Sequence, residues 1–330
     1  MTVCISGFVI YEYFFIRNYF ILMSDFEHFD KNEEKPFSQK LVKILITTQA
    51  LSICFLSVLF VFYLKAKKNQ IQGDGSRKTI IGIAGHRLFS PIYQDYGIYS
   101  ENSYACFTKP FHRLNTTTRI LPVIENFTDL DIKSTVDGIH ALIFQGGYDV
   151  TPSFYGQEPK PELGTINTIL DLYHIAIYKE AKSRGIPIFG FCRGFQLINI
   201  IENGTMYQDQ SYYPVPSNMT RINHRILTNV TDGYHNVTIY PNTILHSLFN
   251  KDTIFTNSIH HQIVDRIGSI FKVVAVSQAD GVPEAVERKD GGSFIMGTQF
   301  HPEFHVWKSD EFLPVFQLIV NEANKFRSIK

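Results

Sequence analysis

Residues 186–200 read IPIFGFCRGFQLINI, and this stretch decides the expected fold. The apolar run 188–191 predicts a buried strand, and the apolar spacing over 194–202 predicts a helix that begins almost at once. Cys192 therefore falls on a sharp turn from a strand into a helix. Such a turn is typical of α/β proteins that carry a reactive side chain at the end of a strand.

Two glycines flank Cys192 in the G-x-nucleophile-x-G spacing of a nucleophile elbow. Gly190 and Gly194 are expected there because the strand and the helix approach closely. The helix N-terminus favours a thiolate, and the backbone N–H of Arg193 is available to an oxyanion. The alternative is that Cys192 is a small buried core residue, which is how most lone cysteines are used.

On both sides of the elbow, short apolar runs alternate with stretches whose apolar residues have helical spacing. After about residue 235 the segments become shorter and strand-like, with turn signals between them. Alternation of strands and helices predicts an α/β fold with a parallel sheet, in a single domain over 79–330. Besides the elbow, strands are predicted over 79–85, 119–124 and 138–147, and a helix over 167–184.

A candidate general base for Cys192 lies far downstream in the sequence. The string IMGTQFHPEF (295–304) predicts a strand that is followed by His301 and Glu303. Because the carboxyl ends of neighbouring parallel strands share one crevice, His301 can face Cys192, with Glu303 fixing its tautomer. The chain has 12 histidines, however, and a lone histidine is more often structural than catalytic.

Two further strings add weaker signals. In FQGGYDVTPSFYG (144–156), the pair Gly146-Gly147 follows a strand and could supply a second oxyanion donor; a plain glycine turn is the alternative. The string SIHHQ (258–262) could line a pocket or form an ordinary polar loop.

Together these strings resemble the class I glutamine amidotransferase-like superfamily, and within it the gamma-glutamyl hydrolases of the gamma-glutamyl-gamma-aminobutyrate hydrolase type. The resemblance covers roughly residues 79–325. It rests on six strings in the family's order: IIGIAG, QGGYDVTPSFYG, GFCRGFQLINI, NGTMYQD, SIHHQ and QFHPE.

The resemblance implies a flavodoxin-like, doubly wound and mostly parallel α/β fold. It implies that Cys192 attacks a gamma-glutamyl amide to form a glutamyl thioester, that His301 protonates the leaving amine, and that water hydrolyses the thioester without a metal or other cofactor. The site residues that it implies are the triad Cys192, His301 and Glu303, the oxyanion-hole residues Gly147 and Arg193, and the glutamyl-binding residues Gln196, His261 and Gln262.

The chain departs from the family on the helix before the elbow strand. Where the family usually has Arg-Asp-x-x-Glu, this sequence has Leu170, Asp171 and His174. Two functions stand beside the hydrolase. One is the glutaminase subunit of an amidotransferase, which needs a separate synthase partner. The other is a catalytically silent, membrane-tethered family member.

The membrane tether is predicted from residues 44–64, ILITTQALSICFLSVLFVFYL, which contain no charge. A helix of this length spans about 30 Å, the thickness of bilayer hydrocarbon. A buried core helix is the alternative. The apolar segment 3–23 is interrupted by Glu12 and Arg17, so it is either a second span or an interfacial helix.

These segments divide the N-terminal part into a region 1–43, a transmembrane helix and a polar linker 65–78. The sequence therefore predicts a single-pass or two-pass membrane protein. Flanking lysines slightly favour a cytosolic catalytic domain. An excess of N-x-T sequons favours a lumenal one, unless it only reflects an Asn- and Thr-rich genome. The sequons begin at Asn115, Asn126, Asn203, Asn218, Asn229 and Asn236.

Composition excludes several classes of protein. Charged residues, 31 basic and 31 acidic, give a formal net charge of zero, which argues against nucleic acid as a partner. Four cysteines are too far apart in the sequence for a metal-ligand pair or a disulfide framework. The expected partners are a small gamma-glutamyl substrate and a membrane through residues 44–64.

Overall fold

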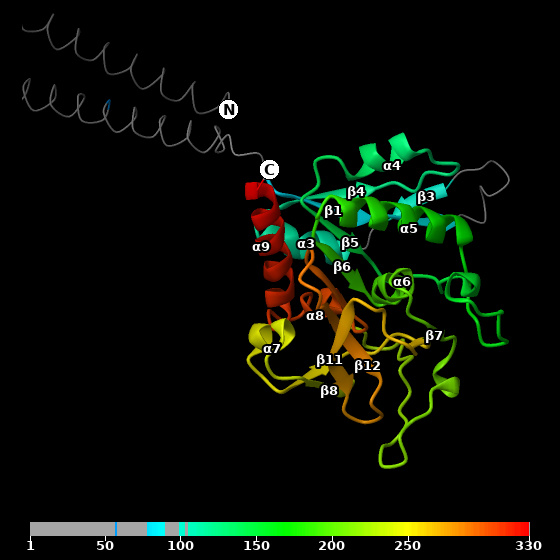
Figure 1. The fold of residues 1–330 in the computed structure, drawn as a ribbon. Helices are drawn as coiled ribbons and strands as arrows, with labels where there is room; N and C mark the ends of the chain where they lie inside the picture. The colour runs from blue at the N-terminus through cyan, green and yellow to red at the C-terminus, as the bar shows by residue number, and fades with distance from the viewer. Residues whose placement is uncertain (1–56, 58–77, 90–98, 103–104, 330) are drawn as a thin grey trace, which may run out of the picture. The chain divides into compact units, whose positions relative to one another are not determined.

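The 330-residue chain separates by its internal contacts into two units, Met1–Arg77 and Lys78–Lys330. The second unit carries the α/β fold (Figure 1). The computed structural model describes Ser57 and residues 78–89, 99–102 and 105–329.

The helices that the structure describes contradict the predicted membrane localisation. Across the described ranges, no helix is both long enough and apolar enough to cross a bilayer. The longest of them, α9 (Leu313–Ile329), has 17 residues and reaches about 26 Å, short of the roughly 30 Å that a span requires. The segments 3–23 and 44–64, on which the prediction rested, lie outside the described residues except for Ser57.

The main sheet has nine strands, and the prediction of an α/β fold is confirmed. Its first five strands run parallel in the order β4-β1-β5-β6-β13, which is the 2-1-3-4-5 order of a doubly wound sheet. The bounds of these strands are β1 Ile80–Ala84, β4 Thr117–Leu121, β5 Ala141–Phe144, β6 Ile188–Phe191 and β13 Ile295–Thr298.

The rest of the sheet is antiparallel, so the sheet is mixed. Strands β12, β11, β8 and β9 continue it beyond β13. Two pairs of short strands, β2 with β3 and β7 with β10, lie outside it. The bounds are β8 His235–Ile239, β9 Thr253–Thr256, β11 Phe271–Ser277, β12 Pro283–Arg288, β2 His86–Phe89, β3 Tyr99–Asn102, β7 Met206–Tyr207 and β10 Ile263–Val264.

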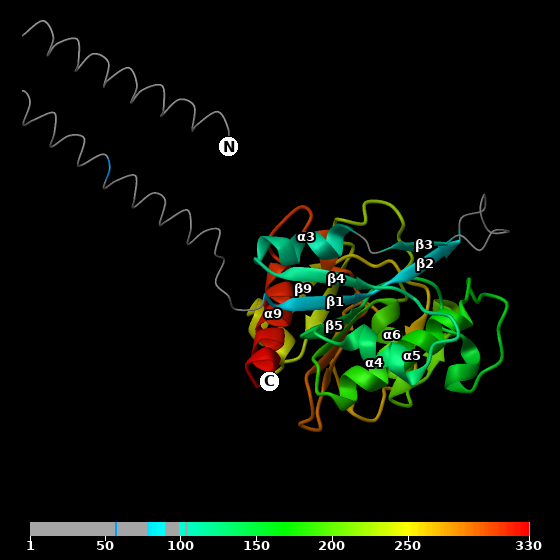
Figure 2. The ribbon, with the colours of Figure 1, turned by 90° about the horizontal axis from the view of Figure 1, so that it is seen from above.

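Helices cover both faces of the parallel strands (Figure 2). Helices α3 and α9 pack on one face, and α4, α5 and α6 pack on the other, because alternate residues of each buried strand point to opposite faces. The bounds are α3 Ala105–Arg113, α4 Asp129–Val136, α5 Thr168–Ser183, α6 Arg193–Ile201, α7 Ile244–Phe249 and α8 Pro302–His305, with short 3-10 helices at Pro152–Tyr155 and Gln210–Tyr212.

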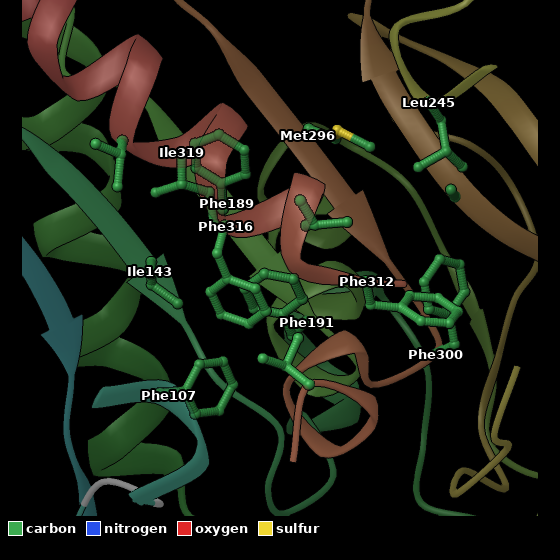
Figure 3. Packing of buried hydrophobic residues seen from close by; sticks show 14 of the residues in the cluster. Phe107, Ile143, Phe189, Phe191, Leu245, Met296, Phe300, Phe312, Phe316 and Ile319 are labelled. Carbon is green, nitrogen blue, oxygen red and sulfur yellow. The ribbon is translucent and has the colours of Figure 1, made fainter. Parts of the chain in front are cut away.

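An aromatic core supports the elbow strand (Figure 3). The ring of Phe191, the residue before Cys192, lies 5.5 Å from the ring of Phe107 on α3 and 6.2 Å from that of Phe316 on α9, measured between centroids. All three side chains are fully buried. Burial of this kind stabilises by roughly 1.5–3 kcal/mol per side chain, so the end of β6 is firmly anchored.

Candidate active site

Three adjacent strand ends form the site. Strands β5, β6 and β13 are parallel neighbours. The residues that follow them are Gly146-Gly147, Cys192 and His301. Phe191 pairs with Thr298, and the N–H of Cys192 donates to the Thr298 carbonyl at 2.8 Å. The parallel register therefore brings together residues that are 109 positions apart in the sequence.

Cys192 sits on a strained elbow. Its backbone angles are φ 50° and ψ −106°, outside the conformations that residues with a side chain normally adopt. The elbow glycines allow this turn by close backbone approach. A Cβ at Gly190 would lie 2.5 Å from the carbonyl of Gly194, and one at Gly194 would lie 2.2 Å from the carbonyl oxygen of Phe144.

His301 and Glu303 form a buried pair at the start of α8. The distance from His301 Nδ1 to Glu303 Oε1 is 2.5 Å. Burial lowers the pKa of His301, but the negative charges of Glu303 and Cys192 and its hydrogen bonds to both side chains outweigh burial and raise the pKa well above the ordinary value. His301 is therefore held by an acid on one side and a thiol on the other.

Asn257 fixes the backbone of His301, and the sequence did not single it out. Its side-chain oxygen accepts from the His301 N–H at 2.9 Å, and its side-chain nitrogen donates to the His301 carbonyl at 2.9 Å. Asn257 directly precedes the SIHHQ string, so a polar residue at the end of β9 was the signal available in the sequence.

His86 fixes the glycine turn after β5. Burial and the charge of Arg193 lower the pKa of His86 to about 3, so the ring is neutral and its Nε2–H donates to the carbonyl of Gly146. In a trans peptide the N–H of Gly147 then points away from His86. A Cβ at Gly147 would lie 2.1 Å from the His86 ring, so only glycine fits.

A cavity of about 320 Å³ opens beside Cys192. It is large enough for a small substrate group rather than for a folded partner. The lining residues are His86, Gly146, Gly147, Tyr148, Cys192, Ile259, His301 and Phe304.

The side chain of Arg193 points into a buried polar network beneath the elbow. It donates to Asp171 Oδ1 at 2.5 Å and to His174 Nδ1 at 3.0 Å. His174 donates from Nε2 to the Gly85 carbonyl at 3.1 Å, since a carbonyl can only accept, and this fixes its neutral tautomer. His174, which departs from the family motif, and Asp171, which keeps it, thus anchor Arg193. Asp171 Oδ2 also accepts from Thr151.

The three residues expected to hold a glutamyl group lie outside the lining of the cavity. Gln196 is buried and donates to the side chain of Gln299 at 3.2 Å, and its contact with the Gln262 carbonyl is longer, at 3.4 Å. His261 lies between Asp149 and Asp209, at 3.0 and 3.1 Å. Their role in binding substrate remains a prediction.

A separate buried group could hold a metal ion. Within the described part of the chain, His224, His235 and Glu284 place one polar atom each within 4.8 Å of one another. Imidazole nitrogens and a carboxylate oxygen are ligand types that transition metals accept.

The α/β unit is similar in sequence to known proteins. The family model for Peptidase C26 matches residues 79–303. Protein NtpR of Enterococcus hirae is 32% identical over 244 residues, covering 74% of this chain and 98% of that protein.

Two relatives are named as hydrolases. Human gamma-glutamyl hydrolase is 22% identical over 78% of this chain and 78% of its own length. The gamma-glutamyl-gamma-aminobutyrate hydrolase PuuD of Escherichia coli is 31% identical over 50% of this chain and 62% of its own length. With a family model that matches most of the α/β unit, the chain belongs to the Peptidase C26 family of class I glutamine amidotransferase-like proteins.

Proposed function

We propose that this chain hydrolyses a gamma-glutamyl amide or peptide bond through a glutamyl thioester on Cys192. The observation that carries the proposal is the strained elbow that presents Cys192 to a histidine already paired with a buried glutamate. Such a cysteine–histidine–carboxylate arrangement suits nucleophilic attack on an amide carbon. The names of the human and E. coli relatives support the gamma-glutamyl substrate class.

In the first half of the reaction the Cys192 thiolate attacks the gamma-carbonyl carbon of the substrate. The resulting oxyanion is stabilised by the backbone N–H groups of Gly147 and Arg193. The tetrahedral intermediate then collapses, the C–N bond breaks, and His301 gives its proton to the leaving amine. The products of this half are a free amine and a glutamyl thioester.

In the second half His301, now neutral, takes a proton from water. The hydroxide attacks the thioester carbon and the C–S bond breaks, which restores the Cys192 thiolate beside protonated His301. The product acid gives its proton to solvent and leaves as the free gamma-carboxylate. Glu303 holds the His301 ring through Nδ1, which keeps Nε2 available for proton transfer. The His86–Gly146 contact supports the oxyanion assignment because it leaves the Gly147 N–H unoccupied by His86.

The test is hydrolysis by the purified full-length chain of a panel that contains gamma-glutamyl amides, gamma-glutamyl peptides and free glutamine. We expect turnover of at least one gamma-glutamyl compound and none by Cys192→Ser. The matched control is Cys106→Ser, which should keep activity because Cys106 is a second buried cysteine and burial raises its thiol pKa. Equal turnover by Cys192→Ser and the parent chain contradicts the proposal.

A second measurement tests the site directly. A gamma-glutamyl electrophile should label Cys192, and mass spectrometry of the digested protein locates the label. Labelling of Cys106 instead, or glutamine hydrolysis that begins only when a synthase is added, contradicts the stand-alone hydrolase.

A further inference from the structure

A buried cluster of histidines surrounds Glu284 in the antiparallel half of the sheet. His224 follows the 3-10 helix Gln210–Tyr212, His235 begins β8, His260 lies between β9 and β10, and Glu284 is on β12. All four side chains are at least nine-tenths buried. Four separate segments between residues 224 and 284 thus bring polar groups together.

The polar atoms converge on one oxygen. Glu284 Oε1 lies 3.4 Å from His235 Nε2, 3.7 Å from His224 Nδ1 and 3.9 Å from His260 Nε2. In a tetrahedral zinc site with bonds near 2.0–2.2 Å, neighbouring ligand atoms are about 3.3–3.5 Å apart. The distances to Glu284 Oε1 exceed that separation by up to about 0.5 Å, and the ligand atoms of His224, His235 and Glu284 lie within 4.8 Å of one another, so the cluster must contract to hold an ion.

Two of the histidines are oriented as metal ligands usually are. His224 donates from Nε2 to Asp280 at 3.0 Å, and His260 donates from Nδ1 to the Gln262 carbonyl at 3.0 Å. Each histidine therefore presents its other, unprotonated nitrogen toward Glu284. A carboxylate or carbonyl behind the ring is the usual support of a zinc-bound imidazole. The contact that a metal would replace at His224 Nδ1 is the 2.9 Å hydrogen bond to the hydroxyl of Ser258.

Several atoms of the cluster lack a hydrogen-bond partner. These atoms are both ring nitrogens of His235, Nε2 of His260 and both carboxyl oxygens of Glu284. Buried polar atoms rarely stay unpaired, so a ligand for them is expected. The competing explanation is a protonated Glu284, since burial raises its pKa well above the ordinary value.

We propose that His224, His235, His260 and Glu284 bind one divalent transition-metal ion, with zinc the best match. Three imidazole nitrogens and one carboxylate oxygen suit zinc rather than magnesium or calcium, which prefer oxygen ligands alone. The protein supplies all four ligands at a buried point, which is typical of structural rather than catalytic metal sites.

The metal would act on the architecture of the cleft. It joins β8 and β12 to the segment that contains His260. That segment begins at Asn257, whose side chain holds the backbone of His301. The proposal is independent of the proposed hydrolysis, because its readout is bound metal.

The experiment uses the full-length chain carrying Cys192→Ser, since a thiol beside His301 and Glu303 could itself bind zinc. Metal is removed with a chelator, ZnCl2 is titrated in by calorimetry, and CoCl2 is titrated in with visible absorption. We expect one equivalent of either ion per chain, a higher melting temperature with zinc, and the intense visible bands of tetrahedral cobalt without sulfur-to-metal charge transfer.

Substitutions locate the ion. Glu284→Gln and His235→Gln, made in the same Cys192→Ser chain, should abolish the binding of one zinc or cobalt ion per chain. Asp280→Asn, which changes the carboxylate behind His224 without removing a proposed ligand, should weaken affinity about 10–100-fold. The control is His246→Gln, a more exposed histidine paired with Asp252, which should bind zinc fully.

Three results overturn the proposal. They are absence of zinc and cobalt binding by the Cys192→Ser chain, full binding by Glu284→Gln and His235→Gln, and cobalt bands that indicate octahedral or sulfur coordination. If circular dichroism shows that the substituted chains do not fold, the stoichiometry and cobalt bands of the Cys192→Ser chain decide the proposal.

Discussion

The two sides of the cysteine–histidine pair are held in different ways. On the elbow side, formed by β5, β6 and α6, backbone packs directly on backbone, with no room for a Cβ at Gly190 or Gly194. On the histidine side, formed by β13 and α8, His301 is held by the side chains of Asn257 and Glu303. Steric contact therefore fixes the nucleophile, whereas hydrogen bonds and charge fix the base.

The largest expected effect on this comparison is on the histidine side. Glu303→Gln removes the charge that holds His301, and kcat should fall roughly 10³–10⁴-fold with little change in KM. Steady-state kinetics on a substrate found in the panel measures this. Glu311→Gln, at an exposed acid paired with Lys251, should leave kcat unchanged.

The same substitution changes the pH dependence. In the parent chain burial lowers the pKa of His301, but the effects of Glu303 and Cys192 together outweigh burial and raise the pKa well above its ordinary value of about 6.5, so the ring stays protonated up to that raised pKa. Activity that needs the protonated ring is lost as the pH rises through this raised pKa. The basic limb of the pH profile of kcat/KM should therefore move to lower pH in Glu303→Gln. If this limb does not move, the charge of Glu303 is not what raises the pKa of His301.

On the elbow side the next largest effect is on stability. Gly194→Ala forces a Cβ to within 2.2 Å of the Phe144 carbonyl oxygen and should cost about 3 kcal/mol or more in the free energy of unfolding, measured in urea. The control is Gly138→Ala, where nothing lies within 4 Å and only the positive φ of 71° is unfavourable, at roughly 1–2 kcal/mol. Equal costs at the two positions would show that close approach does not hold the elbow.

A smaller effect is expected at the glycine turn. His86→Ala frees the Gly146 carbonyl, so the Gly147 N–H loses its fixed direction and kcat should fall roughly 10–100-fold, less than the loss of a whole oxyanion donor. KM should change little. His86→Gln can still donate to that carbonyl and should recover part of kcat; equal kcat in both variants would count against this orienting role.

The smallest effect is expected at Asn257. Asn257→Ala removes both hydrogen bonds to the His301 backbone and should cost about 1–3 kcal/mol of stability, with a decrease in kcat of roughly tenfold. Thermal unfolding and kinetics measure both. Asn321→Ala, at an exposed position on α9, should stay within about 0.5 kcal/mol of the parent. If the two variants are equally active, the backbone of His301 is held by other contacts.

The sequence predicted the elements around the elbow well. The strand expected over 188–191 is β6, and the helices expected over 194–202 and 167–184 differ from α6 and α5 by one residue at each end. The start of α5 is encoded locally, because the side chain of Asn167 caps the helix by accepting from the N–H of Leu170. The strand expected over 119–124 begins and ends earlier, as β4, because pairing with β1 sets its bounds.

The sequence did not predict the extent of the antiparallel half or its contributions to the site. Short strand-like segments after residue 235 were visible, but their order and direction depend on pairing across the sheet. Asn257, His86 and the group around Glu284 acquire their roles only through that pairing and through loops that cross it. Local spacing contains no information about such contacts.

The sequence by itself determined the elbow, because an apolar strand, two glycines and a helix act over fewer than a dozen neighbouring residues. It also determined that a His-x-Glu pair follows a second strand. Only the tertiary structure decided which groups hold that pair in place, and that Arg193 turns its side chain away into a buried network with Asp171 and His174. The physical reason is that contacts between distant segments depend on strand register and burial, which exist only once the sheet has formed.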